Sequence, residues 1–175
     1  MAVWNVIDHT ELSGGAAAYE KTSITSGYDH LYFVASARTD ASVYYDFCHF
    51  YFNGDNTDSN YFSQFTNAFT ATPASNSGDY SWGAQVPGAS GYGEMFGICE
   101  MWIPNYANSS NEKSVFTRCV APNRSTTDYQ YNVGFAGNVW ENTAAINAIK
   151  FLPYGGTDDF VQYSSFTLYG INGAG

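Results

Sequence analysis

Positive charge and leucine are both scarce in this chain. Its 175 residues include only 6 Lys and Arg against 16 Asp and Glu, which gives a net charge of -10 at pH 7. A surface of that sign lacks the electrostatic attraction on which nonspecific binding to nucleic acids or anionic membranes relies. With only 4 Leu and 3 Lys, the chain is also poor in residues that favour helices. We therefore expect a protein with no nucleic-acid or membrane partner.

Long apolar runs, an export signal and paired cysteine motifs are also missing. No stretch approaches 18 apolar residues, and residues 1–5 (MAVWN) form neither a basic n-region nor an apolar h-region. These features predict a protein that is made and kept in the cytosol until it is assembled or released. The cysteines, Cys48, Cys99 and Cys119, lack the CxxC spacing of zinc and thioredoxin-like sites. We expect free, mostly buried thiols, with pairing of two of them across neighbouring strands as the alternative.

Phe, Tyr and small polar residues are abundant instead. Phe and Tyr number 28, and Gly, Ser, Thr and Asn together number 63. Aromatic residues favour strands, whereas Gly, Ser and Asn favour turns. The length is that of one domain, and neither a linker nor a charge block divides the chain. We predict a single folding unit over residues 1–175.

The apolar pattern predicts about ten strands joined by turns rich in Gly, Asn and Ser. The predicted ranges are residues 3–9, 18–24, 30–37, 43–52, 61–70, 94–103, 114–121, 128–140, 145–152 and 165–171. Residues 61–70 also fit a short helix, because Phe62, Phe65 and Phe69 are spaced by three and four residues. Residues 72–93, with two prolines and five glycines, predict a long surface excursion. This arrangement is typical of an antiparallel β-sandwich.

Three of these strands have informative patterns. Residues 30–37 are almost continuously apolar, which predicts a strand covered on both faces. Residues 94–103 alternate cleanly, with Cys99 and Met101 on one face. Residues 128–140 alternate between apolar and polar or small side chains, which predicts a strand with one exposed face.

No residues have the spacing of a catalytic set. The three histidines, His9, His30 and His49, are accompanied by no GxSxG elbow or HExxH pair, and we expect them to be structural. Glu94 and Glu100 share one face of a predicted strand but lie about 20 Å apart, which is too far for a glycosidase pair. We predict that the protein is not an enzyme and uses no cofactor.

One segment is rich in oxygen ligands. Residues 53–60 (NGDNTDSN) include Asp55 and Asp58 among Asn, Thr and Ser side chains. Oxygen-rich loops of this kind bind calcium in some sandwich proteins. The segment lacks the DxDxDG spacing and the distal Glu of an EF-hand. We predict a structural loop and no metal site, with a calcium site as the alternative.

Aromatic residues outside the regular strands are the candidates for an interaction surface. Trp4, Trp82, Tyr92 and Tyr106 lie near the N-terminus or in less regular stretches, and each ring buries roughly 150 to 250 Å² on contact. We predict that they form an interface. Stacking on sugar rings and folding back over the open end of the sandwich are the alternatives. Because Lys and Arg are scarce, we expect apolar and hydrogen-bonding contacts to hold the partner.

Several short motifs together resemble a family of tailed-bacteriophage virion proteins. They are Tyr28-Asp29-His30-Leu31, Ser36-Ala37-Arg38-Thr39-Asp40, Phe52-Asn53-Gly54-Asp55, Ile149-Lys150-Phe151 and Phe166-Thr167-Leu168-Tyr169-Gly170-Ile171. The resemblance runs from about residue 4 to residue 171, although residues 72–127 match nothing in it. It implies a jelly-roll-like β-sandwich displayed on a phage particle, and it supplies no catalytic residues.

The resemblance leads to two expected functions. The first is a capsid decoration (cement) protein on the exterior of the virion, which binds the lattice of the major capsid protein and forms a homotrimer by analogy with the family. The second is a receptor-binding or carbohydrate-binding module of a tail fibre. A polysaccharide depolymerase would be a third, but the chain has no convergent catalytic set.

Overall fold

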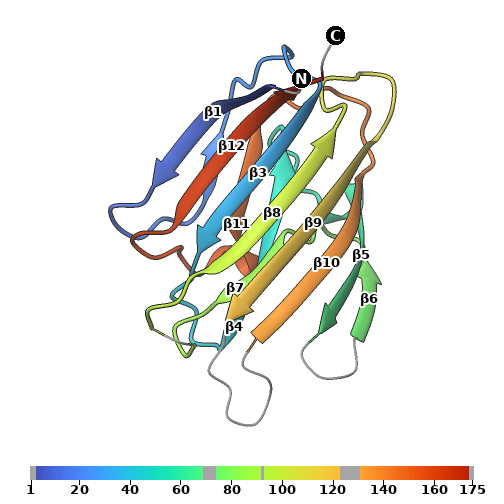
Figure 1. Ribbon diagram of the computed structural model, residues 1–175. Helices are drawn as coiled ribbons and strands as arrows, with labels where there is room; N and C mark the ends of the chain where they lie inside the picture. Colours follow the sequence, from blue (N-terminus) through green and yellow to red (C-terminus); the bar gives the residue numbers. More distant parts are fainter. Residues whose placement is uncertain (1–2, 69–73, 92, 123–130, 174–175) are drawn as a thin grey trace.

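Two antiparallel sheets make up most of the structure, a computed structural model that describes residues 3–68, 74–91, 93–122 and 131–173 (Figure 1). The strands are β1 (Val3–Glu11), β2 (Tyr19–Lys21), β3 (His30–Ala37), β4 (Tyr45–Phe52), β5 (Tyr61–Ala68), β6 (Ala74–Gly78), β7 (Ala84–Pro87), β8 (Gly97–Pro104), β9 (Lys113–Pro122), β10 (Tyr131–Trp140), β11 (Ile149–Pro153) and β12 (Ser165–Asn172). Two short 3-10 helices, η1 (Asp58–Asn60) and η2 (Tyr154–Gly156), lie between strands. The predicted all-β sandwich is confirmed.

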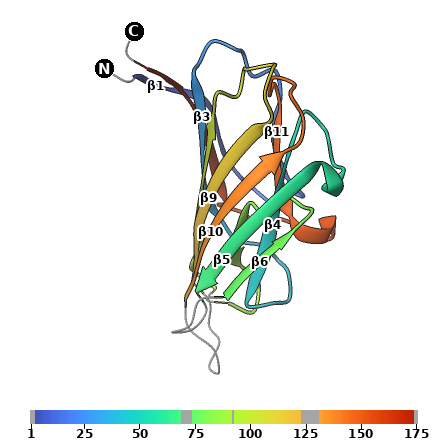
Figure 2. The same cartoon turned by 90° about the vertical axis from the view of Figure 1, so that its right-hand side faces the viewer.

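Eight of the strands are connected in a jelly-roll-like manner. The large sheet has the order β1-β12-β3-β8-β9-β10-β5-β6, and the small sheet has the order β2-β11-β4-β7. From β1 to β4 the chain alternates between the two sheets, and it alternates again from β7 to β8 and from β11 to β12. A jelly roll winds two four-stranded layers around one core in this way. Strands β9, β10, β5 and β6 extend the large sheet beyond that unit, and Figure 2 shows this extension from its side.

Aromatic side chains fill the space between the sheets. Phe33 and Phe166 of the large sheet meet Phe151 of the small sheet and Phe160 of a connecting loop, with ring centroids 5.0 to 6.4 Å apart. All four are fully buried. Ring pairs in such contact contribute roughly 0.5–1.5 kcal/mol each beyond the area that they bury. The core therefore relies on Phe where many proteins would use Leu.

The predicted surface excursion over residues 72–93 is wrong for residues 81–88, which are buried, whereas residues 75–80 are exposed or half-buried. Strand β6 pairs with β5 at the edge of the large sheet, and β7 pairs with β4. All four residues of β7 are buried. Gly83 permits this close packing, because a Cβ atom there would lie only 2.9 Å from the carbonyl oxygen of Cys48. Gly83, Gly88 and Gly91, which predicted a loop, instead mark places where the backbone approaches its neighbours closely.

Strand β10 alternates as predicted, but Val133, Phe135 and Val139 face outward, and the inward face carries Asn132 and Asn138 together with Ala136 and Trp140. Phe135 is 47% exposed, whereas Asn132 and Asn138 are buried between the sheets. The buried amides have partners: Asn138 Oδ1 accepts a hydrogen bond from the backbone N–H of Trp82 at 2.9 Å, and Asn132 donates to Gln85. Hydrogen bonds to Asn132 and Asn138, together with burial of Trp140, thus decide which face of β10 is buried.

Burial in β3 and strand pairing in β5 test the predictions for residues 30–37 and 61–70. In β3 the buried residues alternate with half-buried ones, so the predicted coverage on both faces is wrong. The near-continuous apolar sequence of β3 reflects a second face on which aromatic residues lie close to solvent. Residues 61–68 form strand β5 rather than a helix. The predicted strand ends at residues 69–70 and 128–130 lie outside the described residues.

The three cysteines are free and buried, as predicted. Cys99 and Cys119 lie opposite each other on β8 and β9, and Cys48 lies on β4. Burial raises the pKa of the Cys48 and Cys99 thiols well above the usual range, and it raises that of Cys119 to about 11. Reaction requires an accessible thiolate, so these groups are inert in the folded protein.

We expect the native protein to resist thiol reagents and the denatured, unreduced protein to release three thiols per chain. Titration with a chromogenic disulfide at about pH 8, with and without guanidinium, measures both states. A thiol that reacts in the native protein would contradict the burial. Recovery of only one thiol after denaturation would show that two of the cysteines form a disulfide.

Candidate functional site

The four aromatic residues predicted at an interface have different environments. Trp4 is 53% exposed on β1, as an interface residue must be. Trp82 and Tyr106 are 1% and 0% exposed, so the prediction that they form an exposed anchor is wrong. Removing a buried Trp side chain costs roughly 3–5 kcal/mol, so replacing Trp82 by Ala would destabilise the fold. Tyr92 lies outside the described residues.

Tyr106 has a structural role near the end of the sandwich. Its hydroxyl donates to the carbonyl oxygen of Thr25 and accepts the backbone N–H of Tyr28 at 3.4 Å. The backbone carbonyl of Tyr106 accepts the N–H of Ile146 at 2.9 Å. These bonds join three loops, which agrees with the alternative that some loop aromatics fold back over the sandwich.

Trp4 belongs to a stripe of aromatic rings that crosses the outer face of the large sheet. Tyr169, Tyr32, Trp102 and Phe116 lie directly opposite one another on β12, β3, β8 and β9. Trp4 packs edge-on against Tyr32 and Tyr169, with centroid distances of 5.3 and 5.8 Å. Cross-strand aromatic neighbours of this kind stabilise a sheet while leaving one side of each ring available.

Further apolar side chains continue this stripe toward β10. Ile98, Val120 and Val133 lie opposite one another on β8, β9 and β10, and Phe135 stacks with Phe116 at 6.5 Å. The outer aromatic face, as we name it, consists of Trp4, Tyr32, Ile98, Trp102, Phe116, Val120, Phe135 and Tyr169. It spans the six neighbouring strands from β1 to β10. Soluble monomers rarely leave a large contiguous apolar patch uncovered, and such patches mark contact sites.

Charge on this face is balanced. In the described parts of β3, β8, β9 and β10, Glu100 and Arg118 are the only outward-pointing charged residues, and they pair with each other. The excess negative charge of the protein therefore lies elsewhere. A partner that contacts these four strands meets balanced charge, whereas Glu11 is exposed at the end of β1.

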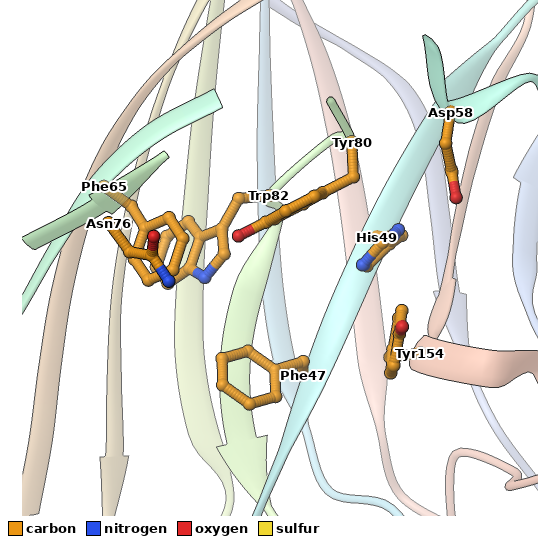
Figure 3. Close-up of a pocket in the computed structure, with 8 residues that line it drawn as sticks. All are labelled: Phe47, His49, Asp58, Phe65, Asn76, Tyr80, Trp82 and Tyr154. Carbon is orange, nitrogen blue, oxygen red and sulfur yellow. The ribbon is translucent and has the colours of Figure 1, made fainter. Parts of the chain in front are cut away.

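A second feature is a pocket beside β4 with a volume of about 280 Å³ (Figure 3). Six of its lining side chains are rings and two are polar: Phe47, His49, Phe65, Tyr80, Trp82, Tyr154, Asp58 and Asn76. Small-molecule pockets in proteins measure about 300–1,000 Å³ and are mostly aromatic and apolar with a few polar groups. This pocket is at the small end of that range, with space for one ring-sized ligand.

His49 contributes to one wall of the pocket. Its ring stacks on Tyr80 at a centroid distance of 5.7 Å and lies 4.8 Å from the ring of Tyr154 (Figure 3). Burial lowers the pKa of His49 to about 4, although the Asp58 carboxylate acts in the opposite direction. The imidazole is therefore neutral at pH 7 and serves as an aromatic wall.

Trp82 contributes another wall and carries an unpartnered donor. Its indole stacks on Phe65 at 5.5 Å. The indole Nε1–H is buried and has no hydrogen-bond partner among the residues that the structure describes, and in Figure 3 it lies on the edge of the ring that faces Phe47. Leaving a buried donor unpaired costs roughly 1–3 kcal/mol. A ligand atom that accepted this hydrogen bond would recover that free energy.

The oxygen-rich loop over residues 53–60 is held by hydrogen bonds within the protein. The Asp55 carboxylate accepts the indole N–H of Trp140 at 2.9 Å and the side-chain amide of Asn60 at 3.0 Å. In the described part of the chain, no group of three or more His, Cys, Asp or Glu residues is placed to hold a metal ion. These contacts give the loop a structural role.

Comparison with protein-family models, with curated proteins and with solved structures finds no match for this chain. Among the described residues, no helix is long and apolar enough to cross a membrane. The outer aromatic face and the pocket beside β4 are thus the two features from which function can be inferred.

We expect Asp55→Ala to lower the free energy of unfolding by about 1–3 kcal/mol, because Trp140 and Asn60 lose their acceptor. Burial alone would raise the pKa of Asp55, but hydrogen bonds from Trp140, Asn60 and Thr57 outweigh it and hold the pKa below its usual value. The carboxylate therefore stabilises the fold at neutral pH, and this contribution is lost as the pH falls through the lowered pKa. Urea unfolding at several pH values measures it.

Prolonged chelation of the wild-type protein is the matching control. Because protein donors occupy the Asp55 carboxylate, we expect chelation to leave the unfolding midpoint unchanged. A lower midpoint that calcium restores would show that the loop binds a metal after all.

The buried His49 predicts a loss of stability in mild acid. An unfolded histidine has a pKa of 6.5 and the folded His49 a pKa of about 4, so stability falls as the pH drops through this interval. Between pH 7 and pH 5 the wild type should lose about 2 kcal/mol more than His49→Phe, which keeps a ring in the wall. Burial raises the pKa of Asp46 to about 6, which has the opposite effect but is common to both proteins. Equal losses in urea unfolding would disprove the assignment.

Proposed function

We propose that this protein is a non-enzymatic structural protein of a tailed-phage virion, and that it attaches to its partner through the outer aromatic face. In this proposal the partner is the major capsid protein, and the chain is a decoration protein on the exterior of the shell. The observation that carries the proposal is an apolar face that spans six strands and has no covering layer in the described chain. The jelly-roll-like sandwich and the motifs of the sequence support the virion setting.

The outer aromatic face is suited to tight attachment. Apolar rings gain free energy when a partner removes them from water, and aromatic residues at the centre of an interface carry much of its binding energy. Trp4 is already packed against Tyr32 and Tyr169, so little conformational entropy remains to be lost on binding. The Glu100–Arg118 pair leaves no uncompensated charge to desolvate.

The remaining parts of the proposal follow from the family resemblance and the charge. Self-association as a homotrimer is supported by the resemblance alone. A net charge of -10 disfavours nucleic acid and anionic lipid as partners. The capsid lattice is then contacted by neutral groups rather than by long-range attraction.

A second function, as a receptor-binding or carbohydrate-binding module of a tail fibre, is favoured by one observation. The pocket beside β4 combines aromatic walls with an unpartnered buried donor, which a purely structural protein does not need. A density map of the whole particle separates the two functions. A chain on the shell supports decoration, and a chain on the tail supports the second function.

We expect Trp4→Ala to weaken binding to shells that lack the protein by about 30-fold, the effect of losing roughly 2 kcal/mol at an aromatic contact. Tyr44→Ala is the matched control, because Tyr44 is also a half-exposed aromatic residue but lies in the loop before β4. Both variants should melt close to the wild type. Co-sedimentation with empty shells measures the binding.

The same assay in rising salt tests the nature of the contact. Neutral groups in contact are barely screened, so binding should change little between low and physiological ionic strength. Release of the protein by salt, together with normal binding of Trp4→Ala, would show an electrostatic interface elsewhere on the molecule.

A further inference from the structure

The pocket beside β4 has the walls and the polar groups that bind a sugar ring. We infer that it takes one neutral hexose unit of a glycan. The inference deepens the second function proposed above and rests on it, whereas the proposal of docking through the outer aromatic face stands without it. The two sites are separate, because the pocket is lined by β4 (Phe47 and His49) and by the inward-pointing Phe65 of β5, whereas the outer aromatic face lies on the outer side of the large sheet.

Aromatic walls match the apolar faces of a pyranose ring. The C–H groups on one face of such a ring pack against an aromatic face. Figure 3 shows Phe47, Tyr80 and Tyr154 around the open space, with His49 between the two tyrosines. Tyr154 is 58% exposed, so it lies at the rim where a ligand would enter. It begins η2, whose two glycines have positive φ angles of 78° and 65° and so permit the tight turn.

Polar groups at the pocket match the hydroxyl edge of a sugar. Each hydroxyl both donates and accepts a hydrogen bond. The unpartnered indole N–H of Trp82 is a donor, and the Asn76 amide offers both a donor and an acceptor. Asp58 offers acceptors: one of its oxygens takes the hydroxyl of Tyr51 at 2.9 Å, which orients the carboxylate. A purely apolar ligand would leave the buried indole N–H of Trp82 unpaired.

The charge of the pocket selects a neutral ligand. No Lys or Arg is among its lining residues, and His49 is neutral at pH 7. Asp58 adds negative charge in a protein that already carries a net charge of -10. A phosphate, a carboxylate or an acidic sugar would meet repulsion without a compensating cation.

Size sets the expected affinity. A volume of about 280 Å³ accommodates one ring rather than a chain of sugars. A ligand of about 12 non-hydrogen atoms at ordinary efficiency binds with a Kd on the order of 1 mM. Many copies on one particle would convert this weak contact into firm attachment to a glycan surface.

Saturation-transfer NMR with the methyl glycosides of glucose, galactose, mannose and N-acetylglucosamine tests the inference on the full chain. We expect at least one of the four to receive saturation. Tyr154→Ala should weaken its binding about fivefold or more, the effect of one lost aromatic contact. Tyr163→Ala is the control, because Tyr163 is equally exposed but does not line the pocket.

Two more variants separate recognition from folding. Trp82→Phe keeps a ring against Phe65 but removes the indole N–H, and Asp58→Asn keeps the shape of the side chain but removes its charge. Asp58 is exposed, so its variant should melt with the wild type. Both should weaken binding of the same glycoside about fivefold or more, because Trp82→Phe loses a hydrogen bond to the ligand and Asp58→Asn loses the charge that strengthens its bond.

Three outcomes would overturn the inference. They are the absence of saturation for all four glycosides, unchanged binding by both Tyr154→Ala and Asp58→Asn, and tighter binding of adenosine, whose base also stacks on rings. A chain found on the tail that nevertheless binds none of the sugars would leave receptor binding in place with a protein receptor. Failure of the sugar site and failure of the second function are thus distinguishable.

Discussion

The hydrogen bond from the backbone N–H of Trp82 to the side chain of Asn138 determines much of the structure. At 2.9 Å, it joins the segment before β7 to the inner face of β10, and Ser63 of β5 contacts the same N–H. On the other side of the residue, the hydroxyl of Thr117 donates to the Trp82 carbonyl oxygen at 3.1 Å. These bonds hold a backbone stretch between the sheets, where unpaired groups would be costly. Strand β7 can therefore be buried on both faces.

The outer aromatic face and the pocket beside β4 both depend on the hydrogen bond between Trp82 and Asn138. Asn138 must point inward to reach Trp82, and in a strand that direction sends Phe135 and Val139 outward, onto the solvent side of the large sheet. If the pairing register of β10 shifted by one residue, these apolar side chains would be buried. Asn138 would then point outward, and the backbone N–H of Trp82 would lose this hydrogen-bond acceptor. The same contact places the Trp82 indole at the wall of the pocket. The same strand register of β10 thus places Asn132 and Asn138 inside and Phe135 outside.

Sequence patterns predicted the sandwich and most strand positions, because alternation with period two identifies a strand whichever face is buried. In β8 the pattern placed Cys99 and Met101 on one face, and the structure shows that this face points inward. Patterns failed where residues distant in sequence determine burial. The sequence near Trp82 resembles a loop, and its burial depends on the side chain of Asn138, which lies 56 residues later. The pocket was not predicted, since Phe47, Asn76 and Tyr154 come from three distant elements. Only Trp4, in an edge strand, could be placed correctly as an exposed ring.

The pairing of β1 with β12 ties the completion of the outer face to the last stage of folding. Trp4 and Tyr169 are far apart in sequence, yet their rings meet on the same surface. Folds dominated by such distant pairings fold slowly, and a chain still on the ribosome cannot form them until its C-terminal strand has emerged. Until then β1 lacks its only neighbouring strand in the described structure. Partly synthesised or C-terminally truncated chains would consequently lack an intact outer face, so assembly would select for chains that have finished folding.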